Sequence, residues 1–337
     1  MLLTDAGWLL LALLIILAGA ELFTNALEHI GERFQLSEGL VGSVFAAVAT
    51  ALPETIVPIV AVFFGGTSVQ AREHIGVGAI LGSPLMLASL AMMLIGLAAG
   101  TKRGWRNPLN PEISGLIRDL LYFLVAFLIG FLALFMPQHP AGLRLLTGAM
   151  LVFLYFMYVL NTIRASAMLV ENGHGTQADA MLWLKRAGLN HSLILELLQL
   201  LVGLGLIIGG AKLFVYGVEQ VAVTTGISVL VLSLLIIPVA TEMPEKLNST
   251  LWIRRGKDTL AFGNVTGAMV FQGSLLPAFG MQLGVWLPQR DIIWSMALTF
   301  AATLWILILA AQRRLSPWLL LVNGLIYLAF FLVIARS

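Results

Sequence analysis

Long apolar segments follow one another along the whole 337-residue chain, separated by short polar stretches. An α-helix needs about 20 mainly apolar residues to cross the hydrocarbon core of a bilayer. Runs of this length are unlike the short alternating segments of a β-barrel, so we expect an all-α polytopic membrane protein. The pattern predicts ten transmembrane helices, at about residues 7–29, 38–64, 74–99, 116–136, 142–164, 192–220, 227–251, 259–281, 291–312 and 316–335.

Composition narrows the class of protein further. Hydrophobic residues make up 59% of the chain and charged residues only 11%, with a mean hydropathy of +0.96. Soluble domains carry about 25% charged residues, so this chain has too little polar surface for a soluble enzyme. The chain contains no cysteine, which excludes disulfides and thiolate metal sites. A net charge of +2 gives no reason to expect binding to nucleic acid.

Lysine and arginine predict the orientation in the membrane. Twelve of them lie in the odd-numbered loops and four on the other side. Because cytoplasmic loops are enriched in these residues, we expect both termini outside and the polar stretch 165–190 in the cytoplasm of a plasma or inner membrane. No basic residue precedes the first apolar segment, as a signal peptide would require, so we expect residues 7–29 to be a retained helix.

The second half of the sequence repeats the first. At an offset of 191 residues, Thr50 and Glu54 fall on Thr241 and Glu245. Each half has five predicted spans, an odd number, so the two halves enter the membrane from opposite sides. Inverted-topology repeats are typical of secondary transporters, whose substrate sites lie near the bilayer midplane. The predicted parts are a five-helix repeat at 1–164, a cytoplasmic connector at 165–190 and a second five-helix repeat at 191–337.

Two acidic side chains, Glu54 and Glu245, lie deep within predicted spans. A charged side chain at that depth costs about 2.5–3.5 kcal/mol on insertion scales, so each glutamate needs a compensating partner. Lys246 is adjacent in sequence, but neighbouring positions on a helix do not face each other. A bound cation is the functional interpretation; a structural ion pair or a protonated acid is the alternative.

Each half also offers neutral oxygen ligands beside its glutamate. A proline directly before the glutamate frees the carbonyl four residues back, and a threonine lies one turn before the glutamate on the same face. Calcium takes about 6–8 hard oxygen ligands, and two carboxylates neutralise its charge. With no cysteine, and no histidine beside these motifs, a soft-metal site is not expected. The neutral ligands are the carbonyls of Ala49 and Ala240 and the hydroxyls of Thr50 and Thr241.

These segments resemble a known family. The sequences VATALPE at 48–54 and VATEMPE at 239–245 resemble the two alpha-repeat signatures, G-T-S-x-P-E, of the cation/calcium antiporter superfamily, which includes the sodium/calcium exchangers. Gly82-Ser83 and the segment 263–267 resemble the G-N-x-x-G-S-N motif that follows each signature. The resemblance covers nearly the whole chain and both predicted repeats.

The resemblance implies exchange of calcium against sodium or protons by alternating access. It implies no catalytic residue and no cofactor, and as partners only inorganic cations and the lipid bilayer, with no obligate protein partner. By this resemblance the first helix of each half would move over the other eight. The central ligands would be Glu54 and Glu245, with Thr50, Thr241 and Ser83 beside them.

Several positions depart from the family pattern. The serine of each signature is replaced, by Ala51 in the first half and by Glu242 in the second. A polar position further along is Leu87 in the first half and Gln272 in the second. If Glu242 faces the site, two nearby carboxylates cannot both ionise readily, which favours proton-coupled exchange. Alternatively, the following proline turns Glu242 toward the mouth of the site.

We interpret the chain as a secondary antiporter, not an enzyme, that exchanges a hard cation, most simply calcium, against sodium or protons. A divergent family member that moves magnesium or manganese, or that exchanges sodium for protons, stays open as the alternative. A membrane enzyme or a channel is a further rival, to be separated by a flux assay. Glu28, Asp119 and Glu196 lie near the ends of spans, where we expect interfacial anchors.

Overall fold

The structure is a computed structural model that describes residues 2–51, 82–137, 141–171, 175–178, 180–186, 192–225, 242–282, 286–288 and 290–334. Of the predicted ligands, Glu54, Thr241 and Ala240 lie outside these residues, and Glu245 is described only through its backbone. Within the described residues the regular structure is helical, with one isolated bridge between Ser37 and Gly175. The all-α class predicted from the sequence is therefore confirmed.

Helices occupy the predicted spans wherever the structure describes them. Within the described part of the chain, six helices are long and apolar enough to cross a membrane. The number of crossings and the inverted order of the two halves stay predictions. In chain order the helices, with π-helices written η, are α1 (Leu2–Arg33), α2 (Glu38–Leu40), η1 (Val41–Ala46), α3 (Ala47–Thr50), η2 (Leu87–Ala91), α6 (Met92–Arg103), α7 (Ile113–Leu134), α8 (Ala141–Glu171), α9 (Trp183–Arg186), α10 (Leu193–Thr225), α13 (Met243–Arg254), α14 (Asp258–Gln282), α15 (Arg290–Ala311) and α16 (Pro317–Ile334).

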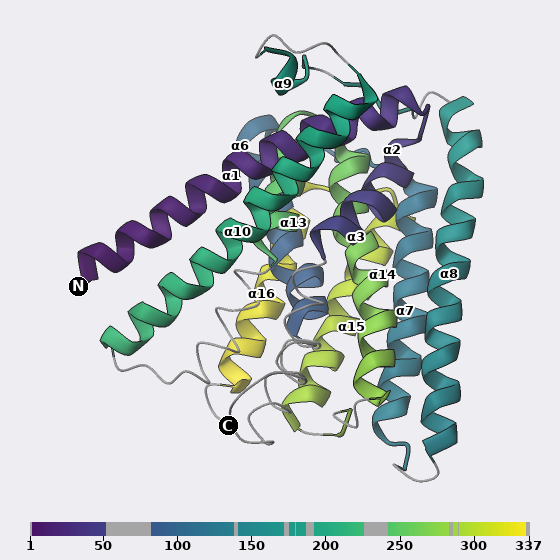
Figure 1. Cartoon of the computed structure of the whole chain (residues 1–337). Coiled ribbons are helices and arrows are strands. Elements are labelled where there is room, and N and C mark those ends of the chain that lie inside the picture. The colour runs from purple at the N-terminus through teal and green to yellow at the C-terminus, as the bar shows by residue number, and fades with distance from the viewer. Residues whose placement is uncertain are drawn as a thin grey trace.

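Two long helices, α1 and α10, lie side by side as an inclined pair against the remaining bundle (Figure 1). Glycines allow their backbones to touch. A Cβ atom on Gly19 would lie 2.9 Å from the backbone nitrogen of Ile207, and one on Gly203 would lie 2.7 Å from that of Phe23. Small residues permit such close approach between membrane helices. The two helices, one near the start of each sequence half, thus form one packed unit.

Helix α14 forms the centre of the bundle, and nearly all of its residues are buried. It packs against α7, α8, α13 and η1. Where α14 crosses η1, a Cβ atom on Gly267 would lie only 2.1 Å from the carbonyl oxygen of Ser43, so no larger residue fits there. This close crossing brings Asn264 of α14 beside α3, the helix that carries the first signature motif.

Buried ion pairs join α1 to its neighbours. Glu28 is fully buried; it accepts a hydrogen bond from Trp252 Nε1 at 3.1 Å and lies 3.0 Å from Lys257 Nζ. At the end of α1, Arg33 pairs with the buried Glu196 of α10 at 2.6 Å. The expectation that Glu28 and Glu196 are interfacial anchors was wrong, because helix packing removes both carboxylates from solvent and supplies each with a cation.

Removing the cation closest to Glu28 is expected to destabilise the protein. Lys257→Met leaves a buried carboxylate with only Arg255, whose Nη1 lies 3.6 Å away. Breaking a buried pair costs about 3–5 kcal/mol, and the remaining arginine favours the lower end of that range. Thermal unfolding of the purified protein in detergent measures the effect. Lys102→Met, at an exposed position of α6, is the matched control. Equal melting temperatures for the two variants would contradict the assignment.

Candidate ion-binding site

Both signature motifs stand where an α-helix ends or begins. Helix α3 ends at Thr50, and Ala51 forms its C-terminal cap two residues before Pro53. Helix α13 begins at Met243 with Pro244 in its first turn, and Glu242 is the residue preceding the helix. Proline fits the first turn of a helix, as Pro244 does in α13, and in a helix interior it removes the hydrogen bond to the carbonyl four residues back, which for Pro53 is that of Ala49. The prolines are thus consistent with the end of α3 at Thr50 and the start of α13 at Met243.

The hydroxyl of Thr50 meets an amide from the second half. Thr50 and Asn264 are both fully buried, and Thr50 Oγ1 lies 3.4 Å from Asn264 Oδ1. The same hydroxyl donates its proton to the carbonyl of Ala46 at 2.8 Å. The lone pairs of the Thr50 oxygen therefore point away from that carbonyl. Ala49, the other predicted ligand in α3, is partly buried beside Thr50.

A second contact joins the two halves, with the roles of the two motifs exchanged. Ser83 is buried, and its side chain interacts with the carboxyl group of Glu242. Ser83 belongs to the second motif of the first half, whereas Glu242 belongs to the first motif of the second half. Thr50 and Asn264 join the other two motifs. Each signature motif therefore contacts the following motif of the opposite half.

Glu242 is fully buried in the protein and is not open to solvent. Its Oε2 lies 2.9 Å from Nζ of Lys246, four residues later on α13, and Lys246 is itself 2% exposed. Adjacency in sequence relates Lys246 to Glu245, whereas the structure pairs it with Glu242 at a spacing of four, a pairing that was not predicted. Glu242 Oε1 has no hydrogen-bond partner among the described residues.

Two buried amides lie on the helices that carry the second-half motifs. Asn248 of α13 and the predicted ligand Gln272 of α14 are both fully buried. Neither amide oxygen nor amide nitrogen of these residues has a hydrogen-bond partner within the described part of the chain. A buried polar group without a partner costs about 1–3 kcal/mol, so such groups call for a ligand or water. Asn248 was not predicted, although its spacing of three from Glu245 places both residues on neighbouring positions of one helix.

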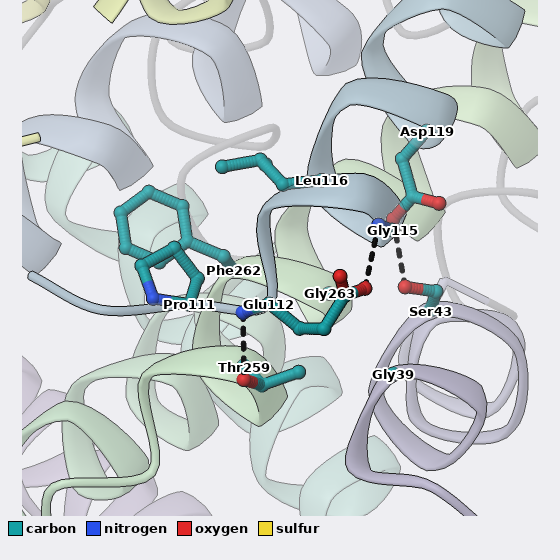
Figure 2. Close-up of a pocket in the computed structure, with 10 residues that line it drawn as sticks. All are labelled: Gly39, Ser43, Pro111, Glu112, Gly115, Leu116, Asp119, Thr259, Phe262 and Gly263. Atoms are coloured by element: carbon teal, nitrogen blue, oxygen red, sulfur yellow. Dashed lines mark hydrogen bonds between the residues drawn. The ribbon is translucent and has the colours of Figure 1, made fainter. Parts of the chain in front are cut away.

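Asp119 has a different role from the interfacial anchor that we expected. It is fully buried, and its carboxylate accepts hydrogen bonds from Ser43 Oγ at 2.7 Å, Thr266 Oγ1 at 2.8 Å and Tyr158 OH at 3.1 Å. Figure 2 shows the small cavity beside this group, where Glu112 caps the first turn of α7. Because the three donors come from η1, α14 and α8, Asp119 fixes these elements around α7.

Helices apolar and long enough to cross a membrane, joined by buried polar contacts between the two sequence halves, define a polytopic membrane protein. A model of the family described as "Sodium/calcium exchanger protein" matches residues 4–164 and 195–336. The chain belongs to this family, and the resemblance identified from its signature motifs is confirmed.

Individual relatives are distant but span most of the chain. The sodium/calcium exchanger MaX1 of Methanosarcina acetivorans is 23% identical, over 97% of each chain. The inner membrane protein YrbG of Escherichia coli is 25% identical, over 78% of this chain and 75% of its own. A solved structure of the sodium-calcium exchanger NCX_Mj aligns with a TM-score of 0.73 at 21% identity, over 99% of each chain. This last likeness establishes a shared fold.

The amide of Asn248, which has no hydrogen-bond partner among the described residues, leads to two predictions of opposite sign. In the ion-free protein, Asn248→Leu removes this buried polar group, so we expect stability to rise by about 1–3 kcal/mol. If Asn248 is an ion ligand, the same substitution lowers the stabilisation produced by adding calcium or sodium. Melting temperatures in detergent, with and without each ion, measure both effects.

Asn323→Leu is the matched control for this experiment. Asn323 is equally buried, but its Nδ2 donates to the carbonyls of Ala88 at 2.7 Å and Ala302 at 3.2 Å. Its replacement should therefore destabilise the protein without ions and leave the ion-induced stabilisation unchanged. A lower melting temperature of Asn248→Leu without ions, with an undiminished response to both ions, would argue against Asn248 as a ligand.

Proposed function

We propose that the chain is a secondary antiporter that exchanges a hard cation, most simply calcium, against sodium or protons by alternating access. Family membership supports ion exchange as the activity. The observation that carries the proposal is the reciprocal contact between halves, Thr50 with Asn264 and Ser83 with Glu242, among fully or nearly fully buried side chains. Polar groups so placed in a membrane bundle are typical of an ion pathway.

In this proposal the central ligands are the carboxylates of Glu54 and Glu245. The neutral ligands are the hydroxyls of Thr50, Thr241 and Ser83, the amide of Gln272 and the carbonyls of Ala49 and Ala240. Reciprocal contacts are what two inverted five-helix repeats, 1–164 and 191–337, would produce around a shared site. The connector 165–190 would lie in the cytoplasm and both termini outside, as the distribution of lysine and arginine indicates.

The α1–α10 pair is the proposed moving element. Its helices contact each other closely, and α1 contacts the rest of the bundle chiefly at α13 and η1. An apolar cavity lies between this pair and η1, lined by side chains that include Leu27, Phe34, Phe45 and Leu197. The apolar lining allows the pair to shift against η1, which alternating access requires, whereas the contacts of Glu28 with Arg255 and Lys257 would have to move with the pair or break.

Removing either central carboxylate should abolish exchange. Glu54→Gln or Glu245→Gln deletes one of the two charges that balance calcium, so we expect calcium uptake to fall at least about tenfold. Uptake into proteoliposomes, driven by an imposed sodium or pH gradient, measures the effect. Glu32→Gln, at an exposed position of α1, is the matched control, and size-exclusion profiles check folding. Undiminished uptake in either site variant would refute the proposed ligands.

The same vesicles separate the remaining alternatives. Competition by magnesium, manganese and sodium identifies the preferred cation, and a protein that moves magnesium or manganese better than calcium belongs to the divergent alternative. A channel would pass calcium downhill without a counter-ion, whereas an antiporter would not. Calcium flux that is independent of both sodium and pH gradients would therefore overturn the proposal of exchange.

A further inference from the structure

One charged pair lies inside the candidate site without access to water. Lys246 Nζ and Glu242 Oε2 are 2.9 Å apart, and the two side chains are 2% and 0% exposed. The sulfur of Met86 lies 3.9 Å from the same ammonium group. Ser83, a predicted ion ligand, interacts with the carboxyl group of Glu242. The ammonium therefore lies one side chain away from a predicted ligand of the first half.

Stability alone does not account for this pair. Both charges lose their hydration, and replacing a buried ion pair by apolar residues of similar volume is often neutral or stabilising. An ammonium group has three donors, and the described residues offer it one carboxylate oxygen and one thioether sulfur. A pair that is buried and incompletely satisfied calls for a reason beyond packing.

Charge balance supplies that reason. Relative to the signature that the chain resembles, Glu242 adds a negative charge where a neutral serine stands. Lys246, directly after the signature, has a positive charge where the first half of the sequence has Thr55. The two changes cancel through a direct contact. Glu54 and Glu245 then remain as the carboxylates available to balance the two charges of a calcium ion. Without Lys246, the site would need one more monovalent cation.

We infer that the Lys246 ammonium is a tethered cation that holds the place beside Glu242 which a mobile monovalent cation would otherwise occupy. In the exchange proposed above, on which this role depends, the tether lowers the number of monovalent ions that move with each calcium ion. Lys246 thus determines how many monovalent ions are exchanged for each calcium ion. Glu242 holds the Lys246 ammonium in place and is not a third ligand for calcium.

Replacing the tethered charge should create a requirement for sodium. In Lys246→Met, the carboxylate of Glu242 stays buried without its cation. Its Oε1, which has no hydrogen-bond partner in the described part of the chain, and the Ser83 hydroxyl are hard oxygen ligands suited to sodium. A sodium ion from solution can then restore charge balance where the ammonium was.

The test uses the full chain at fixed pH and ionic strength, in choline chloride and in sodium chloride. For Lys246→Met we expect a lowered melting temperature in choline that sodium restores. We also expect calcium uptake in choline, driven by a pH gradient, to fall at least about tenfold and to return to within about twofold of wild type in sodium. Lys246→Arg retains the charge and should need no sodium.

The double variant Glu242→Gln/Lys246→Met separates a tethered charge from a packing role. It removes both charges at nearly constant volume, so the difference between its melting temperatures in choline and in sodium should be no larger than that of the wild type. If Lys246→Met is destabilised equally in both salts, the pair is structural and the inference is overturned. If Lys246→Met matches wild type in choline, the ammonium is not needed, and the inference is overturned as well.

Failure of this inference is distinguishable from failure of the proposed function. Restoration of the melting temperature by sodium requires no transport. Sodium-specific stabilisation of Lys246→Met, in a protein whose wild type moves no calcium, would retain the tethered cation and reject calcium exchange. Calcium exchange by the wild type, with no difference between salts in Lys246→Met, would retain calcium exchange and reject the tethered cation.

Discussion

Inside a bilayer, a charged side chain can be stabilised only by other parts of the protein, by a bound ion or by trapped water. This constraint explains where the acids of the chain lie. Glu28 is paired with Lys257, Asp119 accepts hydrogen bonds from three hydroxyl groups, and Glu242 contacts Lys246. The contacts of Glu28 and Asp119 join different helices, and that of Glu242 lies at the start of α13. The charges that are costly to bury therefore also specify how the bundle is assembled.

The Asp119 carboxylate shows how such a group positions the site at a distance. Ser43 in η1 and Thr266 in α14 donate to the same carboxylate oxygen. That shared acceptor fixes α14 against η1 where the glycine contact of Gly267 brings their backbones together. Thr50 lies one turn after η1, and Asn264 lies two residues before Thr266, so the distance between Thr50 and Asn264 follows from this crossing.

The sequence predicted the all-helical class and the helices in the described parts of the spans, because these depend on a local property, the length of apolar runs. The number of crossings and the breaks at both motifs stay predictions. The sequence also predicted Thr50, Ser83 and Gln272 as polar groups that the structure buries. The Asp119 cluster could not be predicted, since its partners lie 39 to 147 residues away in the chain or across a helix crossing. Lys246 and Asn248 could have been found from spacings of four and three once the start of α13 at Met243 was known.

The contributions of the two halves to the described part of the site are unequal. The first half supplies hydroxyl groups, from Thr50 and Ser83, whereas the second supplies an ion pair and the amides of Asn248, Asn264 and Gln272. If the two halves are the repeats proposed above, each must supply polar groups that the other lacks. The charge that Glu242 adds in the second half is balanced by Lys246, and the neutral Ser83 of the first half lies beside that carboxyl group. The described part of the site is therefore shared between the halves and unequal in its ligands.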